Sequence, residues 1–280
     1  MKATDLLHKT KYLLRFYDVS PKKRLGQNFA INNAFLEKLI SYAFLTKDDV
    51  VLEVGAGLGF LTQLLSEKCK KVVTVEVDSR LVRILKEQLR GLHNVELIEG
   101  DIFNVSLPSF NKVVSTPPYC LSSPLLFFLL EKEFDYAVSA LQEEFAKRLS
   151  APVGSKDYSR LTVMVHYKAQ AELLDHVPRG VFYPPPRVDS TIVRLKPRKP
   201  PFPLEDEKIF SQLVRNLFSQ RNKKVRNAVV PFLREQSIKD GDAQKLADAM
   251  LFSDKRAREL APEDFGALAN EFVRKKNLLQ

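Results

Sequence analysis

The feature that most constrains the fold is the alternation of short apolar runs with helical patterns through the first two thirds of the chain. Buried parallel strands are continuous apolar segments, and helices connect one strand to the next. This alternation therefore predicts an α/β domain with a mostly parallel sheet. The predicted strands are 50–54, 71–77, 95–99, 112–115, 136–141 and 189–195, the last expected to close the sheet, and the predicted helices are 33–43, 60–67 and 80–89.

The chain of 280 residues is long enough for this domain and a smaller one. Four prolines lie in 197–203, which is typical of a semi-rigid linker, and almost all of the sequence beyond residue 205 has helical patterns. We expect three parts: a basic N-terminal segment at 1–30, the α/β domain at 31–197, and a small all-helical domain at 198–280.

The composition favours an anionic partner. The net charge is +10, and the first 24 residues hold seven Lys or Arg against two Asp. Nucleic acid and an anionic membrane face are the main candidates, although a basic housekeeping enzyme has the same balance. No apolar run reaches membrane-spanning length, so we expect no membrane partner. The two cysteines lack metal-ligand spacing, which predicts no metal site and a reducing compartment such as the cytoplasm.

A glycine-rich loop follows the first predicted strand. Gly55, Gly57 and Gly59 stand between that strand and its helix, where glycines let a backbone pass close to a ligand. A dinucleotide fingerprint needs its third glycine at position 60, which is Phe60, and no P-loop lysine follows. Alone, the loop is equally compatible with a tight strand–helix turn that binds nothing.

The next two strands end in carboxylates. Glu76 lies 21 positions after Gly55, where a carboxylate can accept both ribose hydroxyls of a nucleoside. Asp101 can accept from an adenine amino group while Ile102 packs on the ring, although a lone aspartate there is also common as a helix cap. The three features at successive strand ends predict a nucleoside pocket. Their order is similar to the S-adenosylmethionine pocket of class I methyltransferases, and the loop has no Lys or Arg for a phosphate.

The segment Thr116-Pro117-Pro118-Tyr119 follows the strand at 112–115. The prolines fix the backbone and its carbonyl directions, and the tyrosine offers a stacking face. The segment resembles the motif with which amino-methyltransferases hold a planar amine, whose first residue is usually Asn, Asp or Ser. A threonine accepts less readily than an asparagine carbonyl, so we hypothesise a slower or less processive enzyme.

Further segments extend the resemblance over nearly the whole chain, in a consistent order. Together they resemble the ribosomal RNA adenine dimethyltransferases, most closely the archaeal and eukaryotic members that act on the small subunit. The segments are 21–29 (PKKRLGQNF), 53–59, 99–101, 118–119, 154–161 (GSKDYSRL), 182–190 (FYPPPRVDS) and 218–226 (FSQRNKKVR).

The resemblance implies a class I (Rossmann-like) seven-stranded sheet with a helical C-terminal domain, and the transfer of methyl groups from S-adenosylmethionine. The acceptors would be two adjacent adenines in a hairpin loop near the 3′ end of small-subunit rRNA, giving N6,N6-dimethyladenosine during ribosome biogenesis. The expected cofactor residues are Asn28 and Ala30 of a lid, with Gly55, Gly57, Glu76, Val77, Asp101, Ile102 and Thr116. The expected catalytic residues are Thr116, Pro117, Tyr119 and Phe182, of which Phe182 is equally plausible as a core residue.

Two basic clusters are expected to bind RNA phosphates, although any single lysine is more often simply solvated. They are Lys22, Lys23 and Arg24 near the lid, and Arg221, Lys223, Lys224 and Arg226 on a predicted helix of the second domain. We expect a monomer that acts on the rRNA or on a precursor of the small subunit. The alternatives are an amino-methyltransferase for large-subunit rRNA, DNA or protein glutamine, and a non-catalytic RNA-binding assembly factor.

Overall fold

The computed structural model describes residues 5–278, which divide into two compact units. The first unit comprises the chain up to residue 146 together with 171–197, and the second comprises 147–170 and the chain from 198 onward. The segment 147–170, expected in the α/β domain, thus groups with the helical unit. It does so because Tyr158 is fully buried there, packs edge-on against Phe218 and donates a hydrogen bond to the Leu260 carbonyl.

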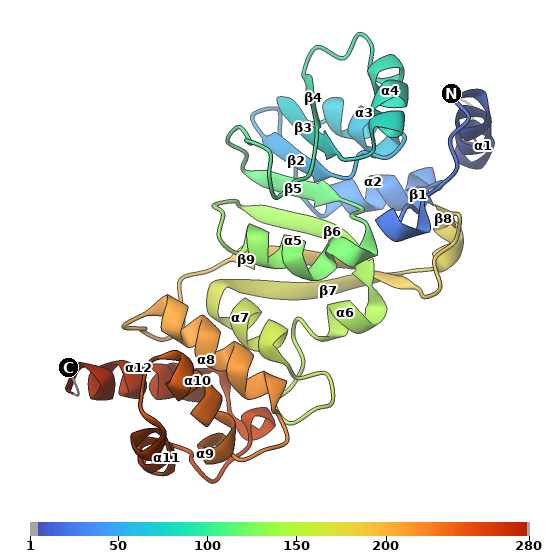
Figure 1. Cartoon of the computed structure of the whole chain (residues 1–280). Helices are drawn as coiled ribbons and strands as arrows, with labels where there is room; N and C mark the ends of the chain where they lie inside the picture. The colour runs from blue at the N-terminus through green and yellow to red at the C-terminus, as the bar shows by residue number, and fades with distance from the viewer. Residues whose placement is uncertain (1–4, 279–280) are drawn as a thin grey trace. The chain divides into compact units, whose positions relative to one another are not determined.

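The first unit contains a seven-stranded sheet, as expected for the α/β class (Figure 1). Its order is β4 (Val95–Glu99), β3 (Lys71–Glu76), β2 (Val50–Val54), β5 (Lys112–Ser115), β6 (Tyr136–Gln142), β9 (Ser190–Pro197) and β7 (Ala169–Val177). The strands from β4 to β6 pair in parallel, whereas β9 is antiparallel to β6. The sheet is therefore mostly parallel, and its carboxyl-end loops meet at one edge.

The prediction that the strand near 189–195 closes the sheet is wrong. β9 lies between β6 and β7, and β7 is the outer strand. The sequence of β7 gave no apolar run because most of its side chains are partly or fully exposed. An outer strand needs fewer apolar residues than a central one, so its pattern is weak.

The helices of the first unit are α1 (Leu6–Phe16), α2 (Asn33–Ser41), α3 (Phe60–Ser66), α4 (Ser79–Gln88), α5 (Ser122–Leu129) and α6 (Glu143–Lys147), with short 3₁₀ turns at Lys23–Leu25, Tyr119–Leu121 and Arg179–Val181. Three of them begin after a side chain that accepts hydrogen bonds from free backbone N–H groups. Asp5 caps α1, Asn32 caps α2 and Asp78 caps α4. Helix α1 was not among the predicted helices.

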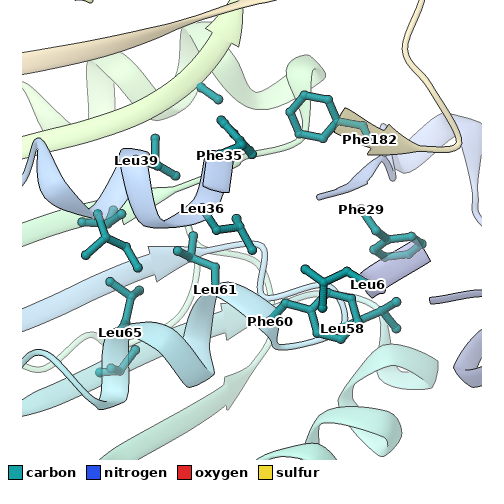
Figure 2. Close-up of a cluster of buried hydrophobic side chains, with 14 of the residues drawn as sticks. Leu6, Phe29, Phe35, Leu36, Leu39, Leu58, Phe60, Leu61, Leu65 and Phe182 are labelled. Carbon is teal, nitrogen blue, oxygen red and sulfur yellow. The ribbon is translucent and has the colours of Figure 1, made fainter. Parts of the chain in front are cut away.

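A buried apolar cluster joins α1, α2 and α3 to the sheet (Figure 2). It also includes a two-stranded antiparallel sheet of β1 (Phe29–Ala30) and β8 (Phe182–Tyr183), in which Ala30 lies opposite Phe182. This pairing brings two segments that are about 150 positions apart together at the rim of the larger sheet.

The second unit is helical apart from the start of β7. Its helices are α7 (Arg160–Lys168), α8 (Glu207–Ser219), α9 (Val225–Ala228), α10 (Val230–Glu235), α11 (Asp240–Asp248) and α12 (Pro262–Leu278), with a 3₁₀ turn at Ala257–Glu259. Its core contains Phe210, Phe232, Phe265 and Phe272, all fully buried. Within residues 5–278, no helix combines the length and apolar character that a membrane crossing requires.

Candidate active site

A hollow opens at the carboxyl ends of β2, β3 and β5 in the first unit. Its volume is about 780 Å³ including the space open to solvent. The loops after the strands form one wall, and the segment 25–30 with Phe182 forms another. Among its described lining residues none is Lys or Arg, whereas Glu53 and Glu76 both face it.

The glycine loop presents bare backbone to this hollow. Gly55 and Gly57 have φ angles of +82° and +58°, which other residues rarely adopt. A Cβ on Gly55 would lie 3.1 Å from Pro118 Cδ, and one on Gly57 would lie 3.1 Å from Phe29 Cδ1. The loop is therefore pressed between the Thr-Pro-Pro-Tyr segment and β1, and only glycine fits at both positions.

Glu76 ends β3 with its carboxylate fixed at the hollow. One oxygen, Oε2, accepts from the Gly57 backbone N–H, and Oε1 accepts from the Asp78 N–H, each at 3.0 Å. The residue is 5% exposed, and burial raises the pKa of its carboxyl group. Backbone donors leave lone pairs of this carboxylate available to a ligand hydroxyl.

Glu53 is a functional candidate that the sequence analysis did not select. It lies on β2, is 1% exposed and lines the hollow. Its Oε2 accepts from the hydroxyls of Thr62 (2.6 Å) and Thr74 (2.8 Å), and burial raises its pKa to about 8. An acidic residue inside a buried apolar strand was the available signal, because such a residue is rare without a specific role.

The segment expected to form a lid is tied to the end of β3 through Asp78. Gln27 donates its side-chain amide to Asp78 Oδ2 at 2.9 Å and accepts from the Lys22 backbone N–H at 2.7 Å. Hydrogen bonds from Arg80 hold the pKa of the Asp78 carboxyl well below its usual range. Asn28 and Ala30 both line the hollow, and the Asn28 amide donates to the Gly26 carbonyl at 3.0 Å. The Gln27–Asp78 link was not predicted.

Asp101 and Ile102 lie one strand further out, and neither belongs to the lining of the hollow. Glu99 is opposite Glu76 in the parallel β3–β4 register, so Asp101 follows the neighbouring strand end. The Asp101 side chain is exposed and accepts from the Phe103 N–H at 3.1 Å, while Ile102 is buried. Val77, by contrast, lines the hollow and is 51% exposed.

The Thr116–Tyr119 segment lies against the glycine loop at Pro118 and borders the same hollow. Thr116, Pro117 and Tyr119 all line it, and Thr116 is partly buried. The Tyr119 hydroxyl lies 2.6 Å from Ser190 Oγ on β9, which anchors the ring at one edge. Phe182 lines the hollow from β8 but is 4% exposed and packs edge-on against Phe35, so it is also a core residue (Figure 2).

The predicted basic residues differ in what they contact. Lys23 and Arg24 are exposed, whereas Lys22 lies 3.6 Å from Asp78. In the second unit, Lys224 and Arg226 are both paired with Asp254. Arg221 donates to the backbone carbonyls of Ser155 and Lys156, and Lys223 is exposed.

The prediction that one helix carries the second basic cluster is wrong. Helix α8 ends at Ser219, and Arg221, Lys223 and Lys224 lie in the turn before α9, so only Arg226 is helical. Among residues 5–278, no cluster of three or more His, Cys, Asp or Glu is arranged to hold a metal ion.

The chain is similar to known proteins over most of its length. The family model described as ribosomal RNA adenine dimethylase matches residues 19–265. A Methanosarcina mazei protein named "Probable ribosomal RNA small subunit methyltransferase A" is 43% identical over 247 residues, covering 87% of this chain and 90% of that protein.

Two solved structures resemble the chain in sequence and in fold. A dimethyladenosine transferase from Plasmodium falciparum has a TM-score of 0.75 and 32% identity, covering 89% of this chain and 98% of the other. The 23S rRNA methyltransferase ErmE has a TM-score of 0.65 and 26% identity, covering 86% and 98%.

Proposed function

The chain belongs to the ribosomal RNA adenine dimethylase family, and we propose that it dimethylates two adjacent adenosines near the 3′ end of small-subunit rRNA. The acceptor is N6 of each adenine in a hairpin loop, and the product is N6,N6-dimethyladenosine. The observation that carries this proposal is that Thr116, Pro117 and Tyr119 line the same hollow as the glycine loop and Glu76.

The chemistry of the hollow fits S-adenosylmethionine. Gly55 and Gly57 line the hollow, and the Glu76 carboxylate is positioned to accept ribose hydroxyls. The lining has no described Lys or Arg, which suits a ligand that carries no phosphate. Asn28 and Ala30 border the hollow from the lid segment. When bound, this cofactor supplies an electrophilic methyl group.

Asp101 and Ile102 remain our proposal for the adenine end of the cofactor. They follow the strand next to Glu76 but do not line the hollow, and the exposed Asp101 carboxylate accepts from its own turn. If the ribose binds at Glu76 and the adenine extends past Val77, the adenine approaches Asp101 and Ile102. Their contribution therefore depends on the ligand reaching beyond the hollow.

The acceptor side orients a weak nucleophile. The lone pair of an adenine amino group is delocalised into the ring, so the site must favour a more tetrahedral nitrogen. The Thr116 hydroxyl and the Pro117 carbonyl accept hydrogen bonds from the two amine hydrogens and direct the lone pair toward the methyl donor. No general base is needed before transfer, because the attacking amine is neutral. Positioning and electrostatics provide the rate enhancement.

The target adenine has to leave its stack to enter the hollow. Tyr119 offers one ring face, and its hydroxyl contact with Ser190 keeps that ring in place. Phe182 borders the hollow on the opposite wall and is held by Phe35. Stacking on an aromatic ring is worth about 1–3 kcal/mol per base, which is enough to hold a flipped adenine.

Basic residues of each unit are proposed to contact RNA phosphates. The exposed Lys23, Arg24 and Lys223 have charge available for phosphate. Three further basic residues already lie close to aspartates: Lys22, Lys224 and Arg226. To contact RNA, each would exchange part of its contact with the aspartate for a phosphate. Arg221 supports the turn around Lys223 through its two backbone contacts.

We infer that the protein acts as a monomer on a precursor of the small subunit in the cytoplasm, during ribosome biogenesis.

One experiment tests the proposed reaction. The full chain is incubated with unmethylated small subunits and labelled S-adenosylmethionine, and the RNA is digested and mapped by mass spectrometry. The expected product is N6,N6-dimethyladenosine at two adjacent positions near the 3′ end. Parallel reactions with large-subunit RNA and with DNA test the two nucleic-acid alternatives.

Two outcomes would contradict the proposal. Label in large-subunit RNA or DNA alone would assign a different substrate. Calorimetric binding of RNA without any binding of S-adenosylmethionine would indicate a non-catalytic factor. The Glu76→Ala variant serves as the control for incorporation that does not depend on the hollow, because its carboxylate is removed while the remaining lining is retained.

A further inference from the structure

Helix α1 exposes two aromatic rings on its outer surface. Tyr12 and Phe16 are 62% and 66% exposed, more than any other large hydrophobic side chain among the described residues. They are one helical turn apart, and their rings stack with centroids 5.7 Å apart and an interplanar angle of 24°. Exposure of two adjacent rings is costly in water, so the pair calls for a partner.

Cations accompany the rings on the same helical face. His8, Lys11, Tyr12, Arg15 and Phe16 are all exposed and recur at helical spacing, which places them in one stripe along α1. No carboxylate lies within the helix; the N-cap Asp5 is paired with His8 at one end of the stripe. The aromatic–cation stripe therefore has a net positive charge, and it alternates ring faces with positive groups.

The opposite face of α1 is buried in the first unit. Leu6, Leu13 and Leu14 belong to the same apolar cluster as Leu58 and Phe60, which line the hollow (Figure 2). The helix is further fixed by two cations of its own, Lys9 over the ring of Phe60 and Lys11 over the ring of Tyr183. The stripe is thus mounted rigidly on the wall of the proposed active site.

We propose that this stripe is a stacking surface for unpaired bases of the substrate rRNA, adjacent to the segment that enters the hollow. This inference rests on the proposed function, and it adds a contact that the N-terminal basic cluster does not provide. Bases stack on Tyr12 and Phe16, and Arg15 contacts the phosphates between them together with Lys11, which exchanges its contact with the Tyr183 ring for phosphate. Aromatic faces interleaved with cations are the combination that binds single-stranded nucleic acid without sequence preference.

The geometry favours RNA over a membrane. A helix that lies in a membrane inserts a broad apolar face, but the leucines of α1 are already buried within the protein. The exposed face offers only two rings, and Lys11 and Arg15 lie beside them at the same level. Lys11 and Arg15 can each pair with a phosphate of a polyanion. An apolar partner would instead remove both cations from water without giving them a counter-charge.

The test replaces the rings while retaining apolar side chains. The double variant Tyr12→Leu/Phe16→Leu keeps the helix and removes both π faces. Its dissociation constant for a protein-free RNA of the small-subunit 3′ end should rise at least tenfold, since each lost base stack is worth about 1–3 kcal/mol and about 1.4 kcal/mol is a factor of ten. With unmethylated subunits as substrate, KM should rise while kcat at saturating substrate is unchanged. Tyr12→Phe should retain wild-type affinity.

The matched control is Phe44→Leu, which removes another exposed aromatic of the first unit that lies against Arg194 but outside the stripe. This control should bind RNA as the wild type does. A second arm uses Lys11→Gln/Arg15→Gln, which removes two cations that neutralise phosphates. The slope of log affinity against log salt should become less negative by about 1.4, or about 0.7 for each phosphate of single-stranded RNA that is no longer neutralised.

Three results would overturn the inference: unchanged RNA affinity in the leucine double variant, an equal loss in Phe44→Leu, or binding of the wild type to phosphatidylserine vesicles that the stripe variants lose. These failures differ from failure of the proposed function. If the wild-type chain does not methylate small-subunit RNA, the reaction itself is wrong. If it does and the stripe variants match it, only the stacking surface is wrong.

Discussion

The two sides of the hollow are stabilised in different ways. On the glycine-loop side, Glu53 and Glu76 are buried carboxyl groups, and each accepts two hydrogen bonds from the protein. On the acceptor side, Thr116 to Tyr119 rely on two prolines and one hydroxyl contact, between Tyr119 and Ser190. Buried carboxyl groups are costly unless they have partners, whereas a neutral acceptor can be positioned by a restricted backbone. Substitutions should therefore affect the two sides by different amounts.

The largest effect is expected from the pH dependence that Glu53 imposes. Burial raises its pKa from 4.5 to about 8, so between these values the folded chain holds a proton that the unfolded chain has released. The free energy of unfolding should therefore fall as pH rises from about 4.5 to 8, by on the order of 3–5 kcal/mol in total. Glu53→Gln keeps an oxygen that can accept from Thr62 and Thr74. Because glutamine does not titrate, the variant should lack this part of the pH dependence of the free energy of unfolding.

Chemical denaturation of the wild type and Glu53→Gln at pH 5, 6.5 and 8.5 measures the difference. The stability of the variant relative to the wild type should increase steadily with pH. Equal slopes for the two proteins would show that the Glu53 carboxyl is ionised across this range.

The next largest effect should follow removal of the Glu76 carboxylate. Glu76→Ala leaves the Gly57 and Asp78 N–H groups without their acceptor and removes the proposed ribose contact. Hydrogen bonds to charged groups contribute about 1.5–3 kcal/mol each, so affinity for S-adenosylmethionine should fall about 100-fold in calorimetry. Glu96→Ala is the control, because Glu96 lies on the adjacent strand and forms a surface ion pair with Lys71. Comparable losses in both variants would remove Glu76 from the site.

The same contrast explains how much of the fold could be predicted from the sequence. Strands β2, β4 and β5 have the predicted bounds because each is a short run with a clear end. Strand β7 was missed because its exposed side chains break the apolar pattern. Helix α1 was missed because its leucines are separated by basic and aromatic residues, and their burial depends on packing with distant segments.

The candidate site divides in a similar way. Glu76 could be predicted from its place at a strand end, since strand order determines which loops meet. The importance of Glu53 could not, because its partners Thr62 and Thr74 are defined only by the folded register. Asp101 follows the same strand-end rule as Glu76, yet its carboxylate accepts from its own turn, at the Phe103 N–H. The spacing of residues in the sequence does not show that a backbone N–H of the same turn competes with a ligand for the carboxylate.

On the acceptor side, a smaller effect is expected from removal of the hydroxyl that anchors Tyr119. Ser190→Ala leaves the partly buried phenol without this partner and allows the ring to tilt. We expect KM for the RNA substrate to rise about fivefold, while cofactor affinity stays unchanged. The control is Ser139→Ala, which removes a buried hydroxyl from the neighbouring strand that contacts Ser115 instead. An unchanged KM in Ser190→Ala would indicate that packing alone orients the tyrosine.

The smallest effect is expected at Thr116, where the acceptor side departs from the usual Asn, Asp or Ser. A threonine hydroxyl can accept a hydrogen bond from the adenine amine, but its reach is shorter than that of an asparagine carbonyl. Thr116→Asn should therefore raise the single-turnover rate about two- to threefold and increase the ratio of dimethyl to monomethyl product. Both quantities can be read from a time course by mass spectrometry, with Thr116→Val as the variant that keeps the shape and removes the acceptor. If Thr116→Asn raises neither quantity, the threonine does not limit methyl transfer, and the prolines alone determine how the amine is held.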